Sequence, residues 1–514
     1  MTTPLFSATL AAALDENARS FPDKIALVCG ARRVTYPELR DRVRRLTDAM
    51  AQAGIGQGDR ILLLDQNSHI VFETIVAASS LGAMVCPVNW RQSEAELAFV
   101  IDDLAPALII AEDTGEVGPV AAAGLNRARH RPRVSLRAEG GADAPGSYEA
   151  FLASGAAAHV ERVVDPGLPC LVIYTAAFDG FPNGAMLTQT GLITQSASVA
   201  RVQDFSAKTT FLASGPLFHI GTHMFVWAAF VSGGAIVFTP RADAQTLCEL
   251  IDREKITNGF IVGKTIEDIV RLNADGRYDL KSLQAPPFTP EWNAMITVRA
   301  GSGVGYGQTE LTGLVVWPHY GAGIGVHGRP SPGMQIRIVG EDDEDAAPGV
   351  VGEIACRGPS VMAGYWNRPE LNAHRQRHGW HHTNDLGRRE ADGTLTFIGP
   401  KTQMIKSGVE NIYPAEVEGC LKTHPAVLDC AVIGVPDDVW IQSVKAIVVL
   451  RPGADVAESD LVEHCRSRIA SYKKPKTVAF ASSLPRLASG SIDYAALDAA
   501  HGGGNYPGGR VRSA

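Results

Sequence analysis

The chain has 514 residues, of which 45% are hydrophobic and 20% charged, so it is long enough for two or more globular domains. Its formal net charge of −8 argues against nucleic acid as the main partner. The eight cysteines form no CxxC pair, which indicates reduced thiols of a cytoplasmic protein rather than a disulfide framework or a zinc site. The N-terminus lacks the pattern of a signal peptide, and glycine and proline interrupt the uncharged stretch 211–238, so no membrane span is expected.

The first 165 residues alternate patterns that are typical of strands and helices. The capping box Thr35–Glu38 predicts the start of a helix that ends near Gly54. Apolar runs predict strands at 24–29, 61–64 and 83–88, with a helix at 72–81. This order predicts a parallel sheet with right-handed crossovers, whereas the stretch 140–155, rich in Gly, Ala and Ser, is expected to be a loose connection.

The same alternation continues to about residue 330 and then changes. Strands are predicted at 170–174, 185–188 and 259–262, and a helix at 246–254. Short strands at 335–339, 352–357 and 394–398 indicate a β-rich subdomain. After residue 400, helices at 414–424 and 458–470 and strands at 429–434 and 445–450 indicate a smaller α+β unit. The glycine-rich tail from about residue 502 is expected to be disordered.

A glycine-rich stretch, Gly301–Glu310, is the first candidate site. Four glycines in seven residues suit a loop where the backbone approaches a ligand, because glycine weakens helices and strands. Tyr306 offers a ring for stacking, Thr309 a hydroxyl and Glu310 a carboxylate, and this set suits a nucleotide phosphate with Mg²⁺. A simple turn with a solvated Thr–Glu pair fits the stretch equally well when it is considered alone.

Several further motifs occur with this stretch in a specific order. The chain contains GYGQTE at 305–310, GRPSPG at 328–333, GEI at 352–354, GYW at 364–366, TND at 383–385 and a run at 405–418 that begins IKSGVENIYP. On these motifs, and on PLFH at 216–219, the chain resembles the acyl- and aryl-CoA synthetase branch of the AMP-forming adenylating enzymes. The resemblance extends from about residue 35 to about residue 494.

The resemblance implies a fold and a two-step reaction. The expected fold is a large N-terminal α/β domain, residues 1–400, with two sheets flanked by helices and a β-rich subdomain at about 330–400. A small mobile α+β domain, residues 401–514, would follow. In the family, a carboxylate attacks the α-phosphate of ATP to give an acyl-adenylate and pyrophosphate, and a thiol, usually coenzyme A, then attacks the adenylate.

The resemblance also implies roles for individual residues. Tyr306 would stack on adenine, Thr309 would contact the α-phosphate, and Glu310 would hold Mg²⁺. Asp385 would bind both ribose hydroxyls, and Lys406 would border the acid pocket and the thiol channel. The predicted catalytic residues are therefore Thr309, Glu310 and Lys406. The other predicted nucleotide-binding residues are Thr175, Gly180, Gly184, Gly305, Gly307 and Gln308, and the predicted acid-binding residues are His219, Lys264, Gly301 and Gly303.

Some residues depart from the family pattern. The phosphate loop at 174–184 reads YTAAFDGFPNG, so Asp179 replaces a hydroxyl and Asn183 replaces a lysine. Ser491 stands where the family has its catalytic lysine, and Pro400 and Gln403 replace the hinge arginine and aspartate. Loss of one preorganised cation typically costs ~10²-fold or more in rate. These departures predict retained ligand binding with altered catalytic chemistry.

One lysine is gained rather than lost. Lys264 follows an apolar strand at the position of the family's acid-pocket wall. A buried lysine needs an anion, so Lys264 could pair with the carboxylate of a bound acid and turn it away from the phosphate. A loop lysine that reaches solvent is the alternative interpretation.

Three functions are consistent with these observations. The first is an ATP-dependent ligase-like enzyme acting on a small, aromatic carboxylic acid, with ATP or AMP, Mg²⁺ and coenzyme A as its small molecules. The second is a diazotase-type enzyme of secondary metabolism, which would use ATP and nitrite on an aromatic amine. The third is a non-catalytic homologue that binds a ligand, a thiol carrier or a partner enzyme.

Overall fold

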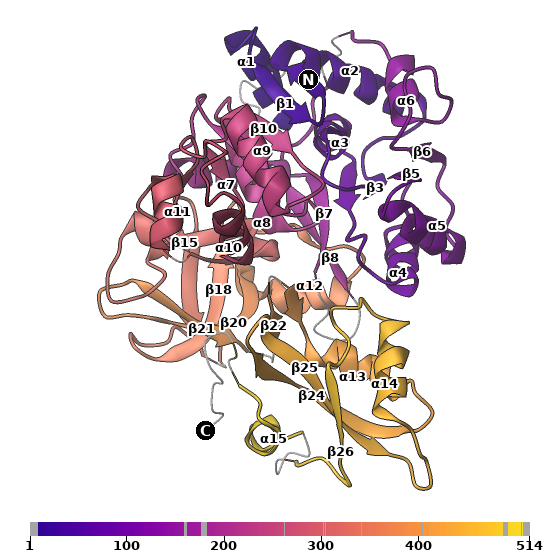
Figure 1. Ribbon diagram of the computed structural model, residues 1–514, viewed down its shortest axis with the longest axis vertical. Helices are drawn as coiled ribbons and strands as arrows, with labels where there is room; N and C mark the ends of the chain where they lie inside the picture. Colours follow the sequence, from indigo (N-terminus) through magenta and orange to yellow (C-terminus); the bar gives the residue numbers. More distant parts are fainter. Residues whose placement is uncertain are drawn as a thin grey trace.

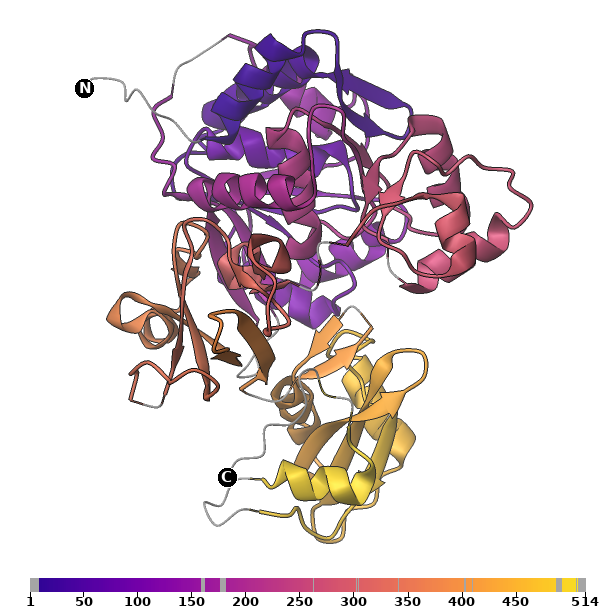
Figure 2. The same cartoon turned by 90° about the vertical axis from the view of Figure 1, so that its left-hand side faces the viewer.

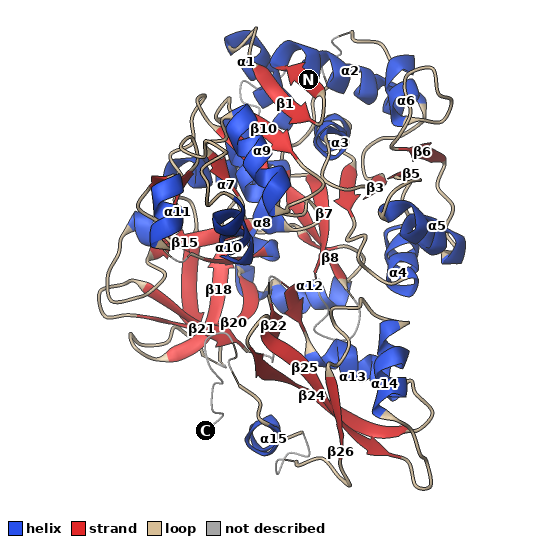
Figure 3. Cartoon of the chain, viewed as in Figure 1, coloured by secondary structure: helices blue, strands red, loops and turns tan. Residues whose placement is uncertain are grey.

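The structure of the chain is a computed structural model, and it describes residues 9–158, 162–175, 182–261, 263–301, 303, 305–340, 342–401, 404–408, 410–486, 492–504 and 506. Two large sheets form the upper part of the molecule in Figure 1, and a separate sheet with its own helices forms the lower part. Figure 3 shows helices on both sides of the strands in the upper part. This mixed α/β architecture is the predicted fold class.

The first large sheet has seven strands, most of them parallel. In spatial order the strands are β19 (Gly364–Tyr365), β8 (Asn183–Thr188), β7 (Pro169–Thr175), β4 (Met84–Pro87), β3 (Arg60–Leu64), β5 (Leu108–Ala111) and β6 (Val134–Arg137). β3 pairs with β4 and β5, β4 with β7, and β5 with β6, all in parallel, whereas the hairpin β7–β8 and the β19–β8 pair are antiparallel. The parallel pairing predicted within the first 165 residues is confirmed for β3 and β4, whereas the strand predicted at 24–29 belongs to the second sheet.

The second large sheet has five strands. In spatial order they are β11 (Asn258–Gly259), β9 (Thr210–Ala213), β10 (Ala235–Phe238), β1 (Ile25–Cys29) and β2 (Arg32–Thr35). All neighbouring strands pair in parallel except those of the β1–β2 hairpin. Because β11 is only two residues long, the strand predicted at 259–262 is shorter than expected.

Helices fill the space between the two sheets and cover their outer faces. One core cluster joins inward residues of both sheets to apolar residues of several helices, among them α1 (Leu10–Ser20), α2 (Tyr36–Gln52), α3 (His69–Ser79) and α8 (Ile220–Val231). Side chains alternate along β3, so Ile61 joins this cluster and Leu62 joins the opposite one. The opposite faces are covered by α4 (Glu94–Leu104) and α5 (Val117–Arg127) on the first sheet, and by α9 (Ala244–Glu254), α10 (Gly263–Leu272) and α11 (Pro290–Met295) on the second.

Capping residues explain where two of these helices begin. Thr35 accepts the Glu38 backbone N–H, and the Glu38 carboxylate accepts the Thr35 backbone N–H, which is the predicted capping box. Ser147 caps α6 (Tyr148–Ser154) by accepting the Ala150 N–H. The prediction of a loose connection at 140–155 is therefore wrong, because Tyr148 and Leu152 of this helix are buried.

The β-rich region expected at about 330–400 is present. It contains a four-stranded antiparallel sheet: β17 (Gln335–Val339), β18 (Val351–Arg357), β20 (His381–Arg389) and β21 (Leu395–Pro400). Beside it, three strands form a second small sheet: β14 (Tyr306–Gln308), β15 (Gly313–Trp317) and β16 (Arg329–Pro330). The remaining elements of the N-terminal part are α7 (Gln189–Val202), α12 (Pro369–Arg375), the pair β12 (Gln284–Ala285) and β13 (Thr297–Val298), and the short helices η1 (Thr309–Leu311), η2 (Pro318–Tyr320) and η3 (Arg377–Gly379).

The C-terminal part has its own sheet and its own core (Figure 2). The long hairpin of β24 (Val427–Asp437) and β25 (Ile441–Leu450) is its centre, and β22 (Ile405–Ser407), β23 (Glu410–Ile412) and β26 (Thr477–Phe480) complete the sheet. Apolar residues of α13 (Pro414–Lys422) and α14 (Glu458–Arg466) pack on one face, and those of α15 (Tyr494–His501) on the other. The predicted domain boundary at 400–401 stays a prediction.

The predicted disorder from about residue 502 does not hold for the first residues of this tail. Gly504 N–H donates to the Gly434 carbonyl at 3.0 Å, and Gly434 N–H donates to the Tyr506 hydroxyl at 2.8 Å. These two hydrogen bonds tie residues 504 and 506 to β24.

Candidate active site

A cavity of about 520 Å³ lies where the N-terminal part meets the C-terminal part. Its walls come from the ends of β4 and β7, the start of α8, the β14–η1 segment, β20, β21 and the segments around 404–413 and 472–473. The carboxyl ends of parallel strands are the usual place for a ligand in such sheets. Most of the residues that the sequence singled out meet here.

One end of the cavity carries the ring and the carboxylate that were predicted to bind a nucleoside. Tyr306 stacks on Phe397 with 5.2 Å between ring centroids. Its hydroxyl donates to Asp385 Oδ2 at 3.0 Å, and Gln308 Nε2 donates to the same oxygen at 2.9 Å. Burial raises the pKa of Asp385 to about 7, although these two donors lower it. The end therefore offers an aromatic surface beside a carboxylate that accepts hydroxyl donors.

Glycine is required in β14 for a packing reason. A Cβ atom on Gly307 would lie 2.0 Å from the Gly313 carbonyl oxygen on β15, so no other residue fits this hairpin. Gly305 and Gly307 both line the cavity, as predicted.

Glu310 lies on η1 in the same wall and is 5% exposed. Its Oε1 accepts a hydrogen bond from the Tyr365 hydroxyl at 2.7 Å. Burial raises the pKa of Glu310, and the negative charge of Glu310 in turn contributes to the raised pKa of Asp385. Two desolvated carboxylates in one wall, beside the Thr309 hydroxyl, suit Mg²⁺, which binds one or two protein carboxylates together with substrate phosphates.

The cavity wall also carries a cation and an imidazole. Lys406 Nζ donates to Asn411 Oδ1 at 2.8 Å, and burial lowers the pKa of this lysine. His219 is the N-cap of α8, where its Nδ1 accepts the Gly221 backbone N–H at 3.1 Å. The His219 side chain is exposed, and desolvation by its neighbours and the nearby charge of Lys406 lower its pKa, which favours the neutral imidazole. Phe218 and Met224 add apolar surface beside these two groups.

His223, one turn further along α8, belongs to the core. It is 1% exposed, and its Nε2 contacts the Leu217 carbonyl oxygen. His223 is therefore a core histidine. His381 and His382 are also buried, each with 2% exposed.

Lys264 does not lie in the cavity, which corrects one predicted acid-binding residue. It stands in the first turn of α10 with 68% of its side chain exposed, and its Nζ lies 3.5 Å from Asp268 Oδ1. Lys264 is exposed because the apolar strand ends at Gly259 and the chain turns into α10 before Lys264 can point inward. Gly301 and Gly303 also lie outside the cavity wall.

The predicted phosphate loop is described only at its edges. Thr175 lines the cavity, and its hydroxyl donates to the Asn183 carbonyl at 3.3 Å. Gly180 lies outside the described residues. Gly184 is buried in β8 and is absent from the cavity wall. Asn183, in place of the family's lysine, accepts a hydrogen bond from Arg368 Nε at 3.0 Å and faces away from the cavity wall.

Sequence reasoning missed several residues of the wall. Asn89 and Gln92 follow β4, a position at the carboxyl end of a parallel strand that could have indicated them. Lys473 lies in a run with Lys474 and Lys476 that is typical of a charged surface, but it is 5% exposed and lines the cavity. Its Nζ lies 2.8 Å from Glu96 Oε1, and it also bonds Glu416, so it joins the two parts of the molecule.

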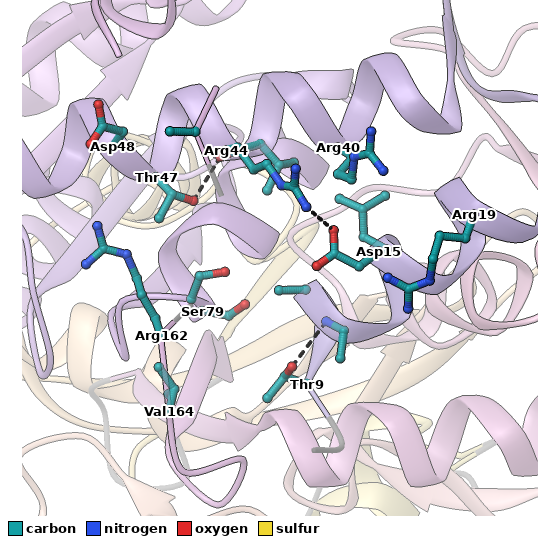
Figure 4. Close-up of a pocket in the computed structure, with 16 residues that line it drawn as sticks. Thr9, Asp15, Arg19, Arg40, Arg44, Thr47, Asp48, Ser79, Arg162 and Val164 are labelled. Atoms are coloured by element: carbon teal, nitrogen blue, oxygen red, sulfur yellow. Dashed lines mark hydrogen bonds and ion pairs between the residues drawn. The ribbon is translucent and has the colours of Figure 1, made fainter. Parts of the chain in front are cut away.

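A second cavity, of about 330 Å³, lies between α1 and α2 on the opposite side of the N-terminal part (Figure 4). Arg19, Arg40, Arg44 and Arg162 line it, and Arg44 Nη2 donates to Asp15 Oδ1 at 2.8 Å. It contains none of the residues that the sequence predicted for the site.

Comparison with known proteins identifies the family. Residues 14–366 match the AMP-binding enzyme family, and residues 416–491 match the AMP-binding enzyme C-terminal domain. The chain belongs to the AMP-binding enzyme family. It is thus an acyl- or aryl-CoA ligase-like adenylating enzyme, as the motifs implied.

Two curated relatives of this AMP-binding enzyme cover nearly its whole length. An indoleacetate–CoA ligase from Aromatoleum aromaticum is 33% identical over 495 residues, which are 93% of this chain and 95% of the relative. A feruloyl-CoA synthase from Amycolatopsis sp is 34% identical over 491 residues, which are 92% of this chain and 95% of the relative.

Solved structures agree with the fold of this AMP-binding enzyme. An o-succinylbenzoate CoA synthetase from Bacillus subtilis, bound with a product analogue, matches with a TM-score of 0.77 at 25% identity and covers 95% of this chain and 97% of its own. An amide bond synthetase from Marinactinospora thermotolerans matches with a TM-score of 0.79 at 24% identity, covering 96% and 99%. No helix within the described residues is long and apolar enough to cross a membrane.

Proposed function

We propose that this enzyme activates a small aromatic carboxylic acid with ATP and transfers it to coenzyme A, using a set of catalytic groups that differs from the family pattern. One observation carries the proposal. A single cavity is lined by the ring and carboxylate suited to a nucleoside and by a partly buried cation, Lys406, together with apolar side chains.

The nucleotide would occupy the end formed by Tyr306, Asp385 and Phe397. Adenine would stack on the Tyr306 ring, and the two ribose hydroxyls would donate to the Asp385 carboxylate in place of the Tyr306 and Gln308 donors. Thr309 and Glu310 would face the phosphates. Mg²⁺, held by Glu310, would neutralise phosphate charge in the reacting nucleotide.

Lys406 is the residue proposed to supply the positive charge that Ser491 and Asn183 cannot supply. Adenylation places negative charge on the α-phosphate as the acid's carboxylate oxygen attacks phosphorus and pyrophosphate leaves. A desolvated ammonium stabilises that charge strongly because little water screens it. Burial has already lowered the pKa of Lys406, and its Nζ is held by Asn411, so the cation is positioned before the substrates bind.

The acid would lie in the pocket formed by Phe218, His219 and Met224. A neutral imidazole and a flat apolar wall suit an aryl acid, and the curated relatives named above carry indoleacetate and feruloyl groups in their names. The Lys264 side chain is 68% exposed and lies outside the cavity, so it does not supply the carboxylate anchor that favoured the diazotase alternative.

Pyrophosphate release and AMP formation test the proposal. The purified enzyme is assayed with ATP, Mg²⁺ and indole-3-acetate, ferulate or a long-chain fatty acid, with and without coenzyme A and with and without nitrite. The proposal expects AMP only with an aromatic acid and a thioester only when coenzyme A is added. Lys406→Ala should abolish most of this turnover, and Lys264→Met, a lysine outside the cavity, serves as the matched control.

Other outcomes contradict the proposal in distinguishable ways. Product formation only in the presence of nitrite would establish the diazotase alternative. Nucleotide binding by calorimetry without any pyrophosphate release would indicate a non-catalytic homologue.

A further inference from the structure

The cavity between α1 and α2 is walled by charged side chains from three separate segments (Figure 4). Arg19 and Asp15 come from α1, Arg40 and Arg44 from α2, and Arg162 from the chain just before β7. We call it the arginine cavity. Its volume of about 330 Å³ is at the lower end of the range for small-molecule sites, and its described walls share no residue with the larger cavity. A ligand held here would therefore be small and would lie apart from the proposed nucleotide site.

The described walls of the arginine cavity carry more positive than negative charge. Four guanidinium groups accompany two carboxylates, those of Asp15 and Asp48. Asp15 already pairs with a guanidinium, because Arg44 Nη2 lies 2.8 Å from its Oδ1. Asp48 Oδ2 accepts hydrogen bonds from Gln52 Nε2 and the Ala156 backbone N–H, each at 2.8 Å. The excess of two positive charges is therefore not met within the wall.

Two of the arginines are poorly satisfied by the protein. Arg40 Nε is buried and has no hydrogen-bond partner among the described residues, and its ion pair with the exposed Asp41 is long, at 3.5 Å. No ion pair or hydrogen bond joins Arg162 to another residue that the structure describes. Arg19, in contrast, pairs with Glu16 at 2.7 Å. Because polar groups that lose water normally gain a partner, Arg40 and Arg162 favour an added acceptor.

The hydroxyl groups of the wall do not provide further donors. Thr47 Oγ1 donates to the Val43 carbonyl at 2.8 Å, and Ser79 Oγ donates to the Val76 carbonyl at 2.8 Å. Recognition in the arginine cavity therefore depends on guanidinium groups, which favours an anion over a neutral sugar or polyol.

The placement of the arginines favours an anion with several charged groups. Figure 4 shows Arg19 and Arg40 on one side of the cavity and Arg162 on the other. An anion that contacts both sides needs charged oxygens along its length, as a chain of two or more phosphate groups has. The planar guanidinium fork binds phosphate oxygens two at a time, with charge-assisted hydrogen bonds.

We propose that the arginine cavity binds a small polyphosphate anion, with Arg40 and Arg162 as the residues that contribute most to its affinity. Binding would bring negative charge to the two guanidinium groups that the protein leaves poorly satisfied, and it would join α1, α2 and the segment before β7 through one ligand. The site does not rest on the proposed function, because none of its described residues lies in the larger cavity.

Isothermal titration calorimetry with sodium pyrophosphate, without divalent metal ions, tests the site on the full-length protein. The double variant Arg40→Gln/Arg162→Gln should bind pyrophosphate about 10- to 100-fold more weakly than the wild type, because it loses charge-assisted hydrogen bonds. The double variant Arg127→Gln/Arg129→Gln is the matched control. It removes two exposed guanidinium groups outside both cavities and should bind like the wild type. Far-UV circular dichroism checks that both double variants fold.

Phenylglyoxal, a reagent for arginine, tests the wild-type protein without any variant. Pyrophosphate and tripolyphosphate should slow modification of the peptides that contain Arg40 and Arg162 and leave the peptide with Arg129 unaffected, as followed by mass spectrometry. Succinate at the same ionic strength should give no such protection. Equal protection by succinate, absence of protection, or unchanged pyrophosphate affinity in Arg40→Gln/Arg162→Gln would overturn the proposal. None of these measurements depends on AMP formation, so their failure is distinct from failure of the proposed function.

Discussion

Lys473→Met should weaken the contact between the N-terminal and C-terminal parts. Lys473 has 6% of its side chain exposed, and it bonds Glu96 of α4 and Glu416 of α13, whose side chains are 10% and 6% exposed. At an effective dielectric constant of about 20, two unit charges 2.8 Å apart attract by about 6 kcal/mol. Desolvation of the ions offsets part of this attraction, but removing the cation alone leaves two buried carboxylates without compensation. Such a change typically costs about 3–5 kcal/mol.

Urea unfolding measures this loss, with Lys474→Met as the matched control. The neighbouring Lys474 bonds only Ser471, so its replacement should change stability by about 0.5 kcal/mol or less. Two probes are needed, far-UV circular dichroism and tryptophan fluorescence, because a chain of this size can unfold in more than one step.

The deficit of Lys473→Met should shrink as the pH falls from 8 toward 5. Burial already raises the pKa of Glu416, and removal of the ammonium raises it further, so Glu416 takes up a proton in the variant and its buried charge disappears. A deficit below about 1 kcal/mol at pH 8, or one that grows as the pH falls, would refute the ion-pair account.

The other predictions concern the cavity. Tyr306→Ala should weaken AMP binding roughly 10- to 100-fold in calorimetry, because stacking of a base on an aromatic ring is worth about 1–3 kcal/mol. Lys406→Ala should lower the rate of AMP formation ~10²-fold or more, and Lys406→Arg should restore part of it. Asp385→Asn should weaken AMP binding but stabilise the fold at pH 8 and not at pH 4. Since the folded pKa of Asp385 is raised to about 7, its contribution to stability is present below the ordinary value and lost as the pH rises through 7. Lys264→Met should leave the affinity for the acid unchanged, because its side chain is exposed.

Local patterns predicted most of the elements that build the site. The capping box at Thr35, the apolar run of β3 and the glycine requirement of β14 are each decided within a few residues of the chain. The motif resemblance placed Tyr306 and Asp385 together although 79 residues separate them, and the structure joins them by a hydrogen bond. Local chemistry and family motifs therefore brought together the residues of the cavity that are proposed to bind the nucleoside.

Errors arose where distant contacts decide burial. A lysine beside two other basic residues is typical of a charged surface, yet Lys473 is buried and pairs with a carboxylate 377 residues away in the chain. Lys264 is the opposite case, because an early turn into α10 exposes a lysine that follows an apolar run. Two adjacent histidines have no apolar pattern of their own, yet His381 and His382 are buried on β20, which lies between β18 and β21. A single sequence does not reveal such contacts.

The charges of the cavity explain why altered chemistry is compatible with retained ligand binding. Glu310 and Asp385 are desolvated carboxylates whose pKa values are raised, and Lys406 is a desolvated ammonium whose pKa is lowered. Each group is therefore destabilised in its charged form until a ligand of opposite charge or suitable donors arrive. Nucleotide hydroxyls and a divalent cation would stabilise the charged forms of Asp385 and Glu310. A phosphate or carboxylate would stabilise the charged form of Lys406. Loss of the lysines at positions 183 and 491 removes two cations from this balance but leaves the groups that recognise the nucleoside in place.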